Sequence, residues 1–413
     1  MSCKKRLSIC YVVPGHDLLP TVGPSRNVVT LAQALSKHAD VTIAFRRAEE
    51  RYRPAGIPVL EIEPQAVSAA VDDAAMKGMG YWQFLATLKS LREFVQRDLA
   101  HFDVVLEKGW LLSGYVSALC ARRGQLGVPI ENIVVNPRHA ARQKFMKWLR
   151  LRVSLAIAGR SMRRAPLIIA ETEFLRREIV KFWGVEESRV AVADLGVDRT
   201  LFRPMDVADA RARLGIDTSK TVLVYVGVLD YTHNLEPAIR ALGAVKPEGV
   251  ELHVIGDGMR SQEYRQLAAE MGIACRFHGR VPHAEVPFHI AAADLCLAPY
   301  DAAAFVSGEL GYSTMKIPEY LSVGRPVVSV PSGRVKTLIQ EGGNGFLFAN
   351  EFDRWVAFLR TLPARARLRE MCAAAASTPL TSWEDTALQY LTLCERQLDL
   401  NKRGVEGSWT PIG

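Results

Sequence analysis

The strongest constraint on the fold is a regular alternation between short runs rich in β-branched residues and longer stretches with helical periodicity. This alternation is typical of a parallel, doubly wound sheet in which helices connect successive strands and cover both faces. It occurs in two series, and a chain of 413 residues exceeds the usual size of one domain. We therefore predict an α/β protein with two Rossmann-like, doubly wound domains that face each other across a central cleft.

The same pattern predicts where the elements lie. Strands are expected at 7–13, 40–45, 59–62, 104–107, 133–136 and 167–171 in the first series, and at 221–227, 251–256, 275–279, 295–298, 327–330 and 345–348 in the second. The main helices are expected at 24–37, 81–99, 235–242, 261–271, 285–292 and 314–323. We place one domain at 1–198, a second at 199–382, and a final segment, 383–413, whose helix packs back toward the first domain.

The composition is that of an ordinary soluble protein, with 49% hydrophobic and 23% charged residues. The seven cysteines are odd in number and form no Cys-x-x-Cys pair, so we expect free thiols in a reducing compartment. The sequence has no run of 18 apolar residues, and its short apolar stretch at 7–13 is better explained as a strand than as a signal peptide. We therefore expect a cytoplasmic protein.

The net charge of +8 is concentrated in one segment. Residues 138–164 contain nine Lys or Arg and no Asp or Glu, whereas the rest of the chain carries 43 basic against 44 acidic residues. The positive surplus is therefore local and needs its own explanation.

The most informative segment is 308–330. Its pattern predicts a glycine-containing loop followed by a helix capped by Ser313 or Thr314. Lys316 and Glu319 lie three residues apart, on one face of that helix. A cation and a carboxylate in the first turn suit a diphosphate and a ribose diol, respectively, although a Lys–Glu pair is also common on plain surface helices.

The run from Lys316 to Val328, with Glu319 three positions on and Gly-Arg-Pro-Val-Val at its end, resembles the donor-site signature of retaining GT-B glycosyltransferases of family 4 (group 1). The resemblance implies that Glu319 binds the ribose hydroxyls, and it assigns acceptor binding to the first domain and nucleotide-sugar binding to the second. Many members of the family carry a further glutamate that contacts the sugar. That position is Gly311 here, and Glu309 lies two residues away.

Weaker matches to the family lie elsewhere. Val228 replaces an arginine that usually grips the diphosphate, and His233 stands where a lysine would, so we expect His233 to assist when protonated or, alternatively, to cap the following helix. The segment 194–204 resembles the family's interdomain element. The resemblance assigns donor binding to Gly23, Gly227, His233, Asn234, Arg280, Val281, Glu309, Gly311, Tyr312, Ser313 and Thr314.

His139 follows a predicted strand end where many relatives place a histidine near the sugar. We therefore predict a catalytic set of His139, Lys316 and Glu319, with a purely structural His139 as the alternative. The strand end at 107–109 offers a competing polar group.

The resemblance implies transfer of a hexose from a UDP- or GDP-sugar with retention of configuration. No Asp-x-Asp occurs in the sequence, so we expect no metal, and no cofactor beyond the nucleotide-sugar co-substrate. Two alternatives remain, a non-catalytic GT-B partner subunit and a nucleotide-sugar 2-epimerase.

The basic segment suggests a binding surface. We assign Arg138, Arg142, Lys144, Lys147 and Trp148 to an anionic acceptor, such as a lipid-linked glycan, or to an anionic membrane on whose inner face the protein would be peripheral. The alternative is a domain helix with snorkelling Lys and Arg side chains. We expect no nucleic-acid partner, because no recognised binding motif occurs.

Overall fold

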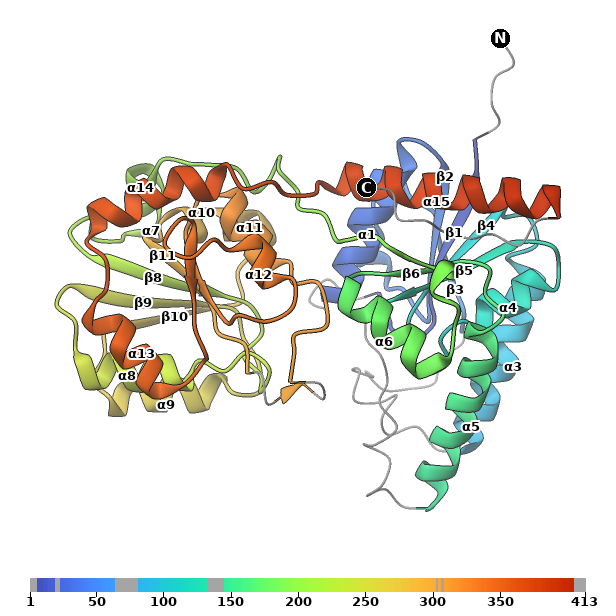
Figure 1. Ribbon diagram of the computed structural model, residues 1–413, viewed down its shortest axis with the longest axis horizontal. Coiled ribbons are helices and arrows are strands. Elements are labelled where there is room, and N and C mark those ends of the chain that lie inside the picture. The colour runs from blue at the N-terminus through green and yellow to red at the C-terminus, as the bar shows by residue number, and fades with distance from the viewer. Residues whose placement is uncertain are drawn as a thin grey trace, which may run out of the picture. The chain divides into compact units, whose positions relative to one another are not determined.

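A computed structural model describes residues 6–18, 23–63, 81–132, 145–301, 304–305 and 308–404. The chain divides into two compact units, in which unit 1 comprises 1–195 with 383–413, and unit 2 comprises 196–382 (Figure 1). Each unit contains one parallel sheet with helices packed around it. The predicted fold class of two doubly wound α/β domains is therefore confirmed.

Unit 1 is built on a seven-stranded sheet with the order β3-β2-β1-β4-β5-β6-β7. Its strands are β1 (Ser8–Val13), β2 (Asp40–Phe45), β3 (Val59–Glu61), β4 (Val104–Lys108), β5 (Leu126–Glu131), β6 (Ile168–Ala170) and β7 (Val190–Val192). Its helices include α1 (Gly23–Ser36), α3 (Tyr81–Arg97), α4 (Tyr115–Ala121), α5 (Phe145–Met162), α6 (Glu173–Trp183) and α15 (Trp383–Arg403). Helix α15 packs against α1, and its Glu384 pairs with Lys37 and His38.

Unit 2 is built on a six-stranded sheet with the order β10-β9-β8-β11-β12-β13. Its strands are β8 (Thr221–Val226), β9 (Val250–Ile255), β10 (Cys275–Gly279), β11 (Leu295–Ala298), β12 (Val327–Ser329) and β13 (Gly345–Leu347). Its helices include α7 (Val207–Leu214), α8 (Glu236–Val245), α9 (Ser261–Glu270), α10 (Val286–Ala291), α11 (Lys316–Ser322), α12 (Val335–Leu338), α13 (Phe352–Arg360) and α14 (Arg365–Ala376). Two apolar cores lie on the sheet, and both contain residues of β8 and β11.

One part of the strand prediction needs correction. The expected strand at 133–136 lies outside the described residues, and the strand beside β4 is instead β5. Gly127 and Pro129 made this segment look unlike a strand. Gly127 is required here, because a Cβ at this position would lie 2.4 Å from the Ser117 carbonyl oxygen of helix α4.

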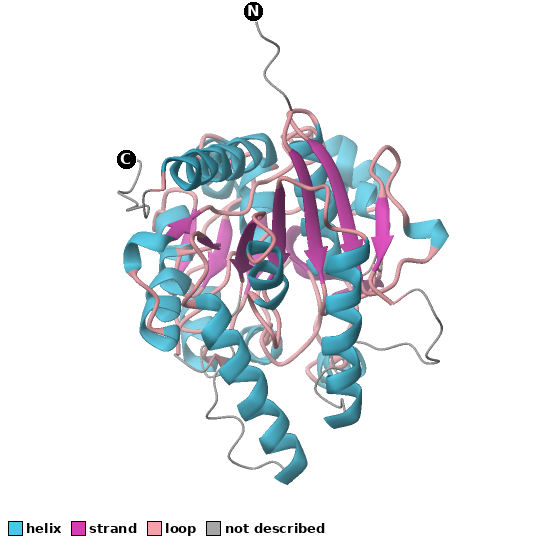
Figure 2. Cartoon of the chain, turned by 90° about the vertical axis from the view of Figure 1, so that its right-hand side faces the viewer, coloured by secondary structure: helices cyan, strands magenta, loops and turns pink. Residues whose placement is uncertain are grey.

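All strand pairs in the two sheets are parallel, so the carboxyl ends of each sheet lie along one edge. Figure 2 shows this edge in unit 1, where the strand arrows end on the same side. Ligands of doubly wound proteins bind beyond that edge, among the loops that follow the strands. The loops after β8, β11 and β12 are therefore the place to look for a site in unit 2.

Candidate functional site

The centre of the candidate site is the end of strand β8. Gly227, the first residue after this strand, has a φ of 148°, and a Cβ there would lie 2.8 Å from the Lys316 Nζ atom. Glycine therefore allows the ammonium group of helix α11 to approach the backbone of β8. Gly256, after β9, meets Gly227 so closely that a Cβ would lie 1.9 Å from the Gly227 carbonyl oxygen.

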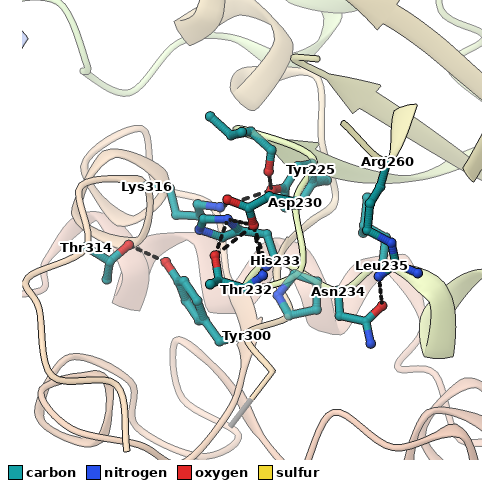
Figure 3. A network of polar contacts seen from close by, with 12 residues as sticks. Tyr225, Asp230, Thr232, His233, Asn234, Leu235, Arg260, Tyr300, Thr314 and Lys316 are labelled. Atoms are coloured by element: carbon teal, nitrogen blue, oxygen red, sulfur yellow. Dashed lines mark hydrogen bonds and ion pairs between the residues drawn. The ribbon is translucent and has the colours of Figure 1, made fainter. Parts of the chain in front are cut away.

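The ammonium group of Lys316 lies between aromatic rings (Figure 3). Its Nζ atom is 4.5 Å from the centre of the Tyr225 ring and 5.3 Å from that of Tyr300, and it donates to the Tyr225 hydroxyl at 3.3 Å. Burial against these groups lowers the pKa of Lys316 to about 7, against the opposing charges of Asp230 and Glu319. The site thus holds a cation that water solvates poorly, which strengthens its attraction to an anion.

Asp230 and His233 form a second polar group in the loop after β8 (Figure 3). The Asp230 carboxylate accepts from His233 Nδ1 at 2.9 Å and from the Thr232 hydroxyl at 2.7 Å. Burial acts to raise the pKa of Asp230, but the bonds and charge of His233 outweigh it, so the pKa is lowered overall. Because an ionised carboxylate can only accept, the Nδ1 atom carries the imidazole proton.

His233 is neutral near pH 7 in the unliganded protein. Burial lowers its pKa to about 4, the charge of Lys316 acts in the same direction, and the Asp230 bond opposes both. Its Nε2 atom faces the Tyr312 hydroxyl at 3.5 Å. Assistance by a protonated His233 stays a prediction, whereas the alternative of a helix cap is wrong because Leu235 is the N-cap of α8.

The loop at 308–314 is held against the segment that follows β12. The Glu309 carboxylate accepts from the Gly333 amide at 3.2 Å, and the Leu310 amide donates to the Ser332 hydroxyl at 2.7 Å. The Arg334 guanidinium donates to the Ser313 hydroxyl at 3.4 Å. Burial lowers the pKa of Arg334 to about 10, so a second poorly solvated cation lies beside this loop.

Helix α11 begins at Lys316, two residues later than predicted, with Met315 as its N-cap and no capping side chain. The expected cap at Ser313 or Thr314 is therefore wrong. The reason is tertiary, because the Thr314 hydroxyl bonds to Tyr300 and the Ser313 hydroxyl accepts from Arg334. Glu319 lies one turn after Lys316, and its side chain is 7% exposed.

Other predicted donor residues have partners of their own. The Asn234 side chain accepts from the Arg260 guanidinium at 2.9 Å. Arg280 pairs with Asp257 at 3.8 Å. Arg280 and its neighbour Val281 follow strand β10, which lies two strands from β8 in the sheet. Helix α1 of unit 1 begins at Gly23.

Most of the predicted acceptor or membrane group lies outside the described residues. This holds for Arg138, His139, Arg142 and Lys144, and for the side chain of Lys147. Trp148 is described, and it lies near the start of helix α5 with 38% of its surface exposed.

Sequence reasoning missed the residues that surround Lys316. Tyr225 is the aromatic residue of strand β8, and Tyr300 lies two residues after the end of β11, the strand partner of β8. Asp230 stands three residues before His233, a spacing that predicts a side chain bonded to nearby backbone amides. No pattern in the sequence pointed to Arg334 as a site residue.

Two further observations bear on the chemistry. Among the residues that the structure describes, no group of three His, Cys, Asp or Glu side chains could hold a metal ion. No helix within the described ranges is long and apolar enough to cross a membrane.

Two doubly wound units, each built on one parallel sheet, have the architecture of the GT-B class. Family models match both units, Glycosyltransferase Family 4 over residues 22–201 and Glycosyl transferases group 1 over residues 220–362. The chain therefore belongs to the family 4 (group 1) GT-B glycosyltransferases, as the sequence predicted, and it is an enzyme of the glycosyltransferase class.

Relatives and solved structures agree with this placement. The D-inositol 3-phosphate glycosyltransferase of Geodermatophilus obscurus is 28% identical, over 92% of this chain and 87% of its own. Sucrose-phosphate synthase from Thermosynechococcus elongatus superposes with a TM-score of 0.75 at 16% identity, over 95% of this chain and 100% of that chain. The Anabaena protein HepE in complex with UDP-glucose superposes with a TM-score of 0.66 at 17% identity, over 96% of this chain and 100% of that chain.

Proposed function

We propose that this enzyme transfers a sugar from a UDP- or GDP-sugar to a hydroxyl of a glycan, lipid-linked or other glycoconjugate acceptor. The transfer retains the anomeric configuration and needs no metal ion. The observation that carries the proposal is the Lys316 ammonium group, held between Tyr225 and Tyr300 at the end of β8 with Glu319 one helical turn away.

Lys316 supplies positive charge to the departing diphosphate. Glycosyl transfer passes through an oxocarbenium-like state in which charge grows on the leaving group. A fixed cation in a poorly solvated site stabilises that charge more strongly than one in water. Since burial lowers the pKa of Lys316 to about 7, an arriving diphosphate favours the protonated form and so increases the charge at the site.

Glu319 binds the ribose hydroxyls, and the segment around Gly311 holds the sugar. Gly311 offers no carboxylate, so the sugar contacts fall to Glu309, Ser313 and the backbone between them. His139 is the proposed group of unit 1 at the reaction centre. The names of the curated relatives make a phosphorylated polyol the first acceptor to test.

The test is donor turnover by the full chain with UDP-, GDP- and ADP-sugars, monitored by thermal shift, hydrolysis and transfer to inositol phosphate. Glu319→Gln should lower turnover about 10- to 100-fold, because it replaces a charged hydrogen-bond acceptor by a neutral one. The matched control is Glu351→Gln, an exposed carboxylate of the same unit. Full activity of Glu319→Gln, or no response of the wild type to any donor, would overturn the proposal.

A further inference from the structure

The imidazole ring of His233 is fixed in the loop after β8 by its neighbours (Figure 3). Its Nδ1 atom donates to the Asp230 carboxylate at 2.9 Å, and the His233 amide donates to the same carboxylate at 3.0 Å. The backbone of His233 forms an antiparallel bridge with Tyr300, and the two ring centres lie 5.3 Å apart. The position and the tautomer of His233 are therefore set before any ligand binds.

This arrangement leaves the other ring nitrogen as a hydrogen-bond acceptor. Because the proton lies on Nδ1, the Nε2 atom of His233 carries a free lone pair. It faces the Tyr312 hydroxyl at 3.5 Å, which is longer than an ordinary hydrogen bond, so a ligand hydroxyl can replace that contact at low cost. Burial, aided by the charge of Lys316, lowers the pKa of His233 to about 4, so Nε2 stays unprotonated near pH 7.

The Nε2 atom lies beside a loop that is short of hydrogen-bond acceptors. Tyr312, which it faces, directly follows Gly311, and Gly311 has no side chain with which to bind a hydroxyl group. The carboxylate two residues earlier, that of Glu309, accepts from the Gly333 amide at 3.2 Å. His233 therefore brings an acceptor from a different loop to the place where the local sequence supplies none.

The acceptor is open to a ligand and lies near the cation proposed to bind the diphosphate. The partly exposed residues here are His233, Gly311, Tyr312 and Lys316, whereas the Tyr300 side chain is buried. The Lys316 Nζ atom lies 5.3 Å from the centre of the Tyr300 ring, so His233 and Lys316 both lie beside this ring. A sugar joined to a diphosphate at Lys316 is therefore close to Nε2.

We infer that the Nε2 atom of His233 accepts a hydrogen bond from a hydroxyl group of the donor sugar, and that Asp230 is the positioning residue that keeps the ring proton on Nδ1. The inference rests on the proposed function, because it takes a nucleotide-sugar as the ligand at Lys316. A donor without this hydroxyl leaves Nε2 unpaired, so His233 selects among sugars. The opposing hypothesis is a protonated His233 that binds the diphosphate, and substitutions that change the charge at this position separate the two.

The first test is calorimetric titration of the full chain with UDP, UDP-glucose, GDP and GDP-mannose. His233→Ala should bind the nucleoside diphosphate like the wild type, but the nucleotide-sugar about three- to tenfold more weakly, as expected for one neutral hydrogen bond. His233→Gln should recover part of this loss because its amide oxygen can accept, whereas His233→Lys should not, because an ammonium group only donates. The control is His38→Gln, which removes a carboxylate-paired histidine of unit 1 and should bind every ligand like the wild type.

The second test uses analogues of the bound nucleotide-sugar in which one sugar hydroxyl at a time is replaced by fluorine, which cannot donate a hydrogen bond. One analogue should bind the wild type about three- to tenfold more weakly than the parent, and His233→Ala should bind that analogue and the parent equally, since both changes remove the same bond. Asp230→Asn should weaken this discrimination, because an amide can donate to Nδ1 and move the ring proton to Nε2. The ¹⁵N chemical shifts of the His233 ring report that change of tautomer directly.

The outcomes separate this inference from the proposed function. If His233→Ala weakened nucleoside diphosphate binding as much as nucleotide-sugar binding, or if His233→Lys kept wild-type affinity for both, His233 would serve the diphosphate and the inference would be wrong. It would also be wrong if every analogue lost the same affinity in His233→Ala as in the wild type. A wild type that bound none of the four nucleotides would overturn the proposed function itself, and the inference with it.

Discussion

Each unit carries a lysine among carboxylates at the carboxyl edge of its sheet, but the two lysines differ in their surroundings. In unit 1, Lys108 is 2% exposed and pairs with the equally buried Glu171 at 3.6 Å. Two further buried carboxyls, Glu107 and Glu131, lie at the ends of β4 and β5. In unit 2, Lys316 is half-buried between aromatic rings.

Desolvation acts on different groups in the two places. In unit 1 burial raises the pKa of Glu107 to about 7 and that of Glu131 to about 8. In unit 2 burial lowers the pKa of Lys316 to about 7. The cation of unit 1 is therefore already neutralised within the fold, whereas that of unit 2 is poised to meet an anion from outside. We infer that Lys108 stabilises the fold of unit 1, whereas Lys316 serves the proposed function in unit 2.

The largest effect should come from Lys108→Met. This change leaves Glu171 buried without its cation, which typically costs about 3–5 kcal/mol of unfolding free energy. Urea unfolding checks this by tryptophan fluorescence in a Trp355→Phe background, because every other tryptophan lies in unit 1 by sequence. Lys316→Met should change stability little, since it removes a poorly solvated ammonium group. Equal losses in both variants would show that the two lysines do not differ.

The second effect concerns catalysis. Lys316→Met should lower donor turnover about 100- to 1000-fold, because the departing diphosphate loses a fixed cation. Lys316→Arg restores the charge and should recover part of the rate, within the limits set by the space beside Gly227. Lys336→Met, at an exposed lysine of the same unit, is the control. Wild-type turnover by Lys316→Met would place the diphosphate elsewhere.

The third prediction is that the two units respond to pH with opposite signs. Glu107 and Glu131 hold protons in folded unit 1 that the unfolded chain releases above its ordinary pKa of 4.5, so stability falls as the pH rises from 4.5 towards 8. Burial lowers the pKa of His233 and His253 to about 4, so unit 2 loses stability as the pH falls from 6.5 to 4. Burial also lowers the pKa of Lys316 to about 7, so above pH 7 this lysine likewise makes unit 2 more stable as the pH rises.

Calorimetry across this pH range, combined with unit 1 fluorescence, separates the two slopes. Each fully shifted group contributes up to about 1.4 kcal/mol per pH unit within its window. Glu131→Gln should flatten the slope of unit 1, and His253→Gln should flatten that of unit 2 near pH 5. If the stability of both units changed with pH in the same direction, the predicted difference between the two units would be wrong.

The fold was predictable wherever local pattern and tertiary role agree. Strands β2 and β11 lie at the predicted residues, because their apolar runs are also largely their buried runs. Strand β10 also lies at the predicted residues, although none of its side chains is fully buried. Strand β5 was missed because Gly127 is chosen for contact with helix α4, which no local pattern reveals. The short strand β7 offered too few residues for a period to show.

The site was predictable only where it is local in sequence. Lys316 and Glu319 share one helical face by spacing alone. Tyr225 and Tyr300 reach Lys316 only because β8 pairs with β11 and because Gly227 leaves room, contacts made across long stretches of chain. The neutral state of His233 depends on its burial, which sequence does not report.

The smallest predicted effect is a gain. Val228 is 51% exposed and follows Gly227, at the position where the family places a diphosphate-binding arginine. Val228→Arg should tighten binding of a nucleoside diphosphate about two- to fivefold at low salt, as expected for one exposed ion pair, and the gain should shrink as salt screens it. Calorimetric titration measures this, with Tyr231→Arg as the control because it adds the same charge at another exposed position of the loop. An equal gain from both changes would indicate net charge alone. No gain from Val228→Arg would mean that the diphosphate does not reach this part of the loop. Its negative charge would then be stabilised by Lys316 and the groups around it.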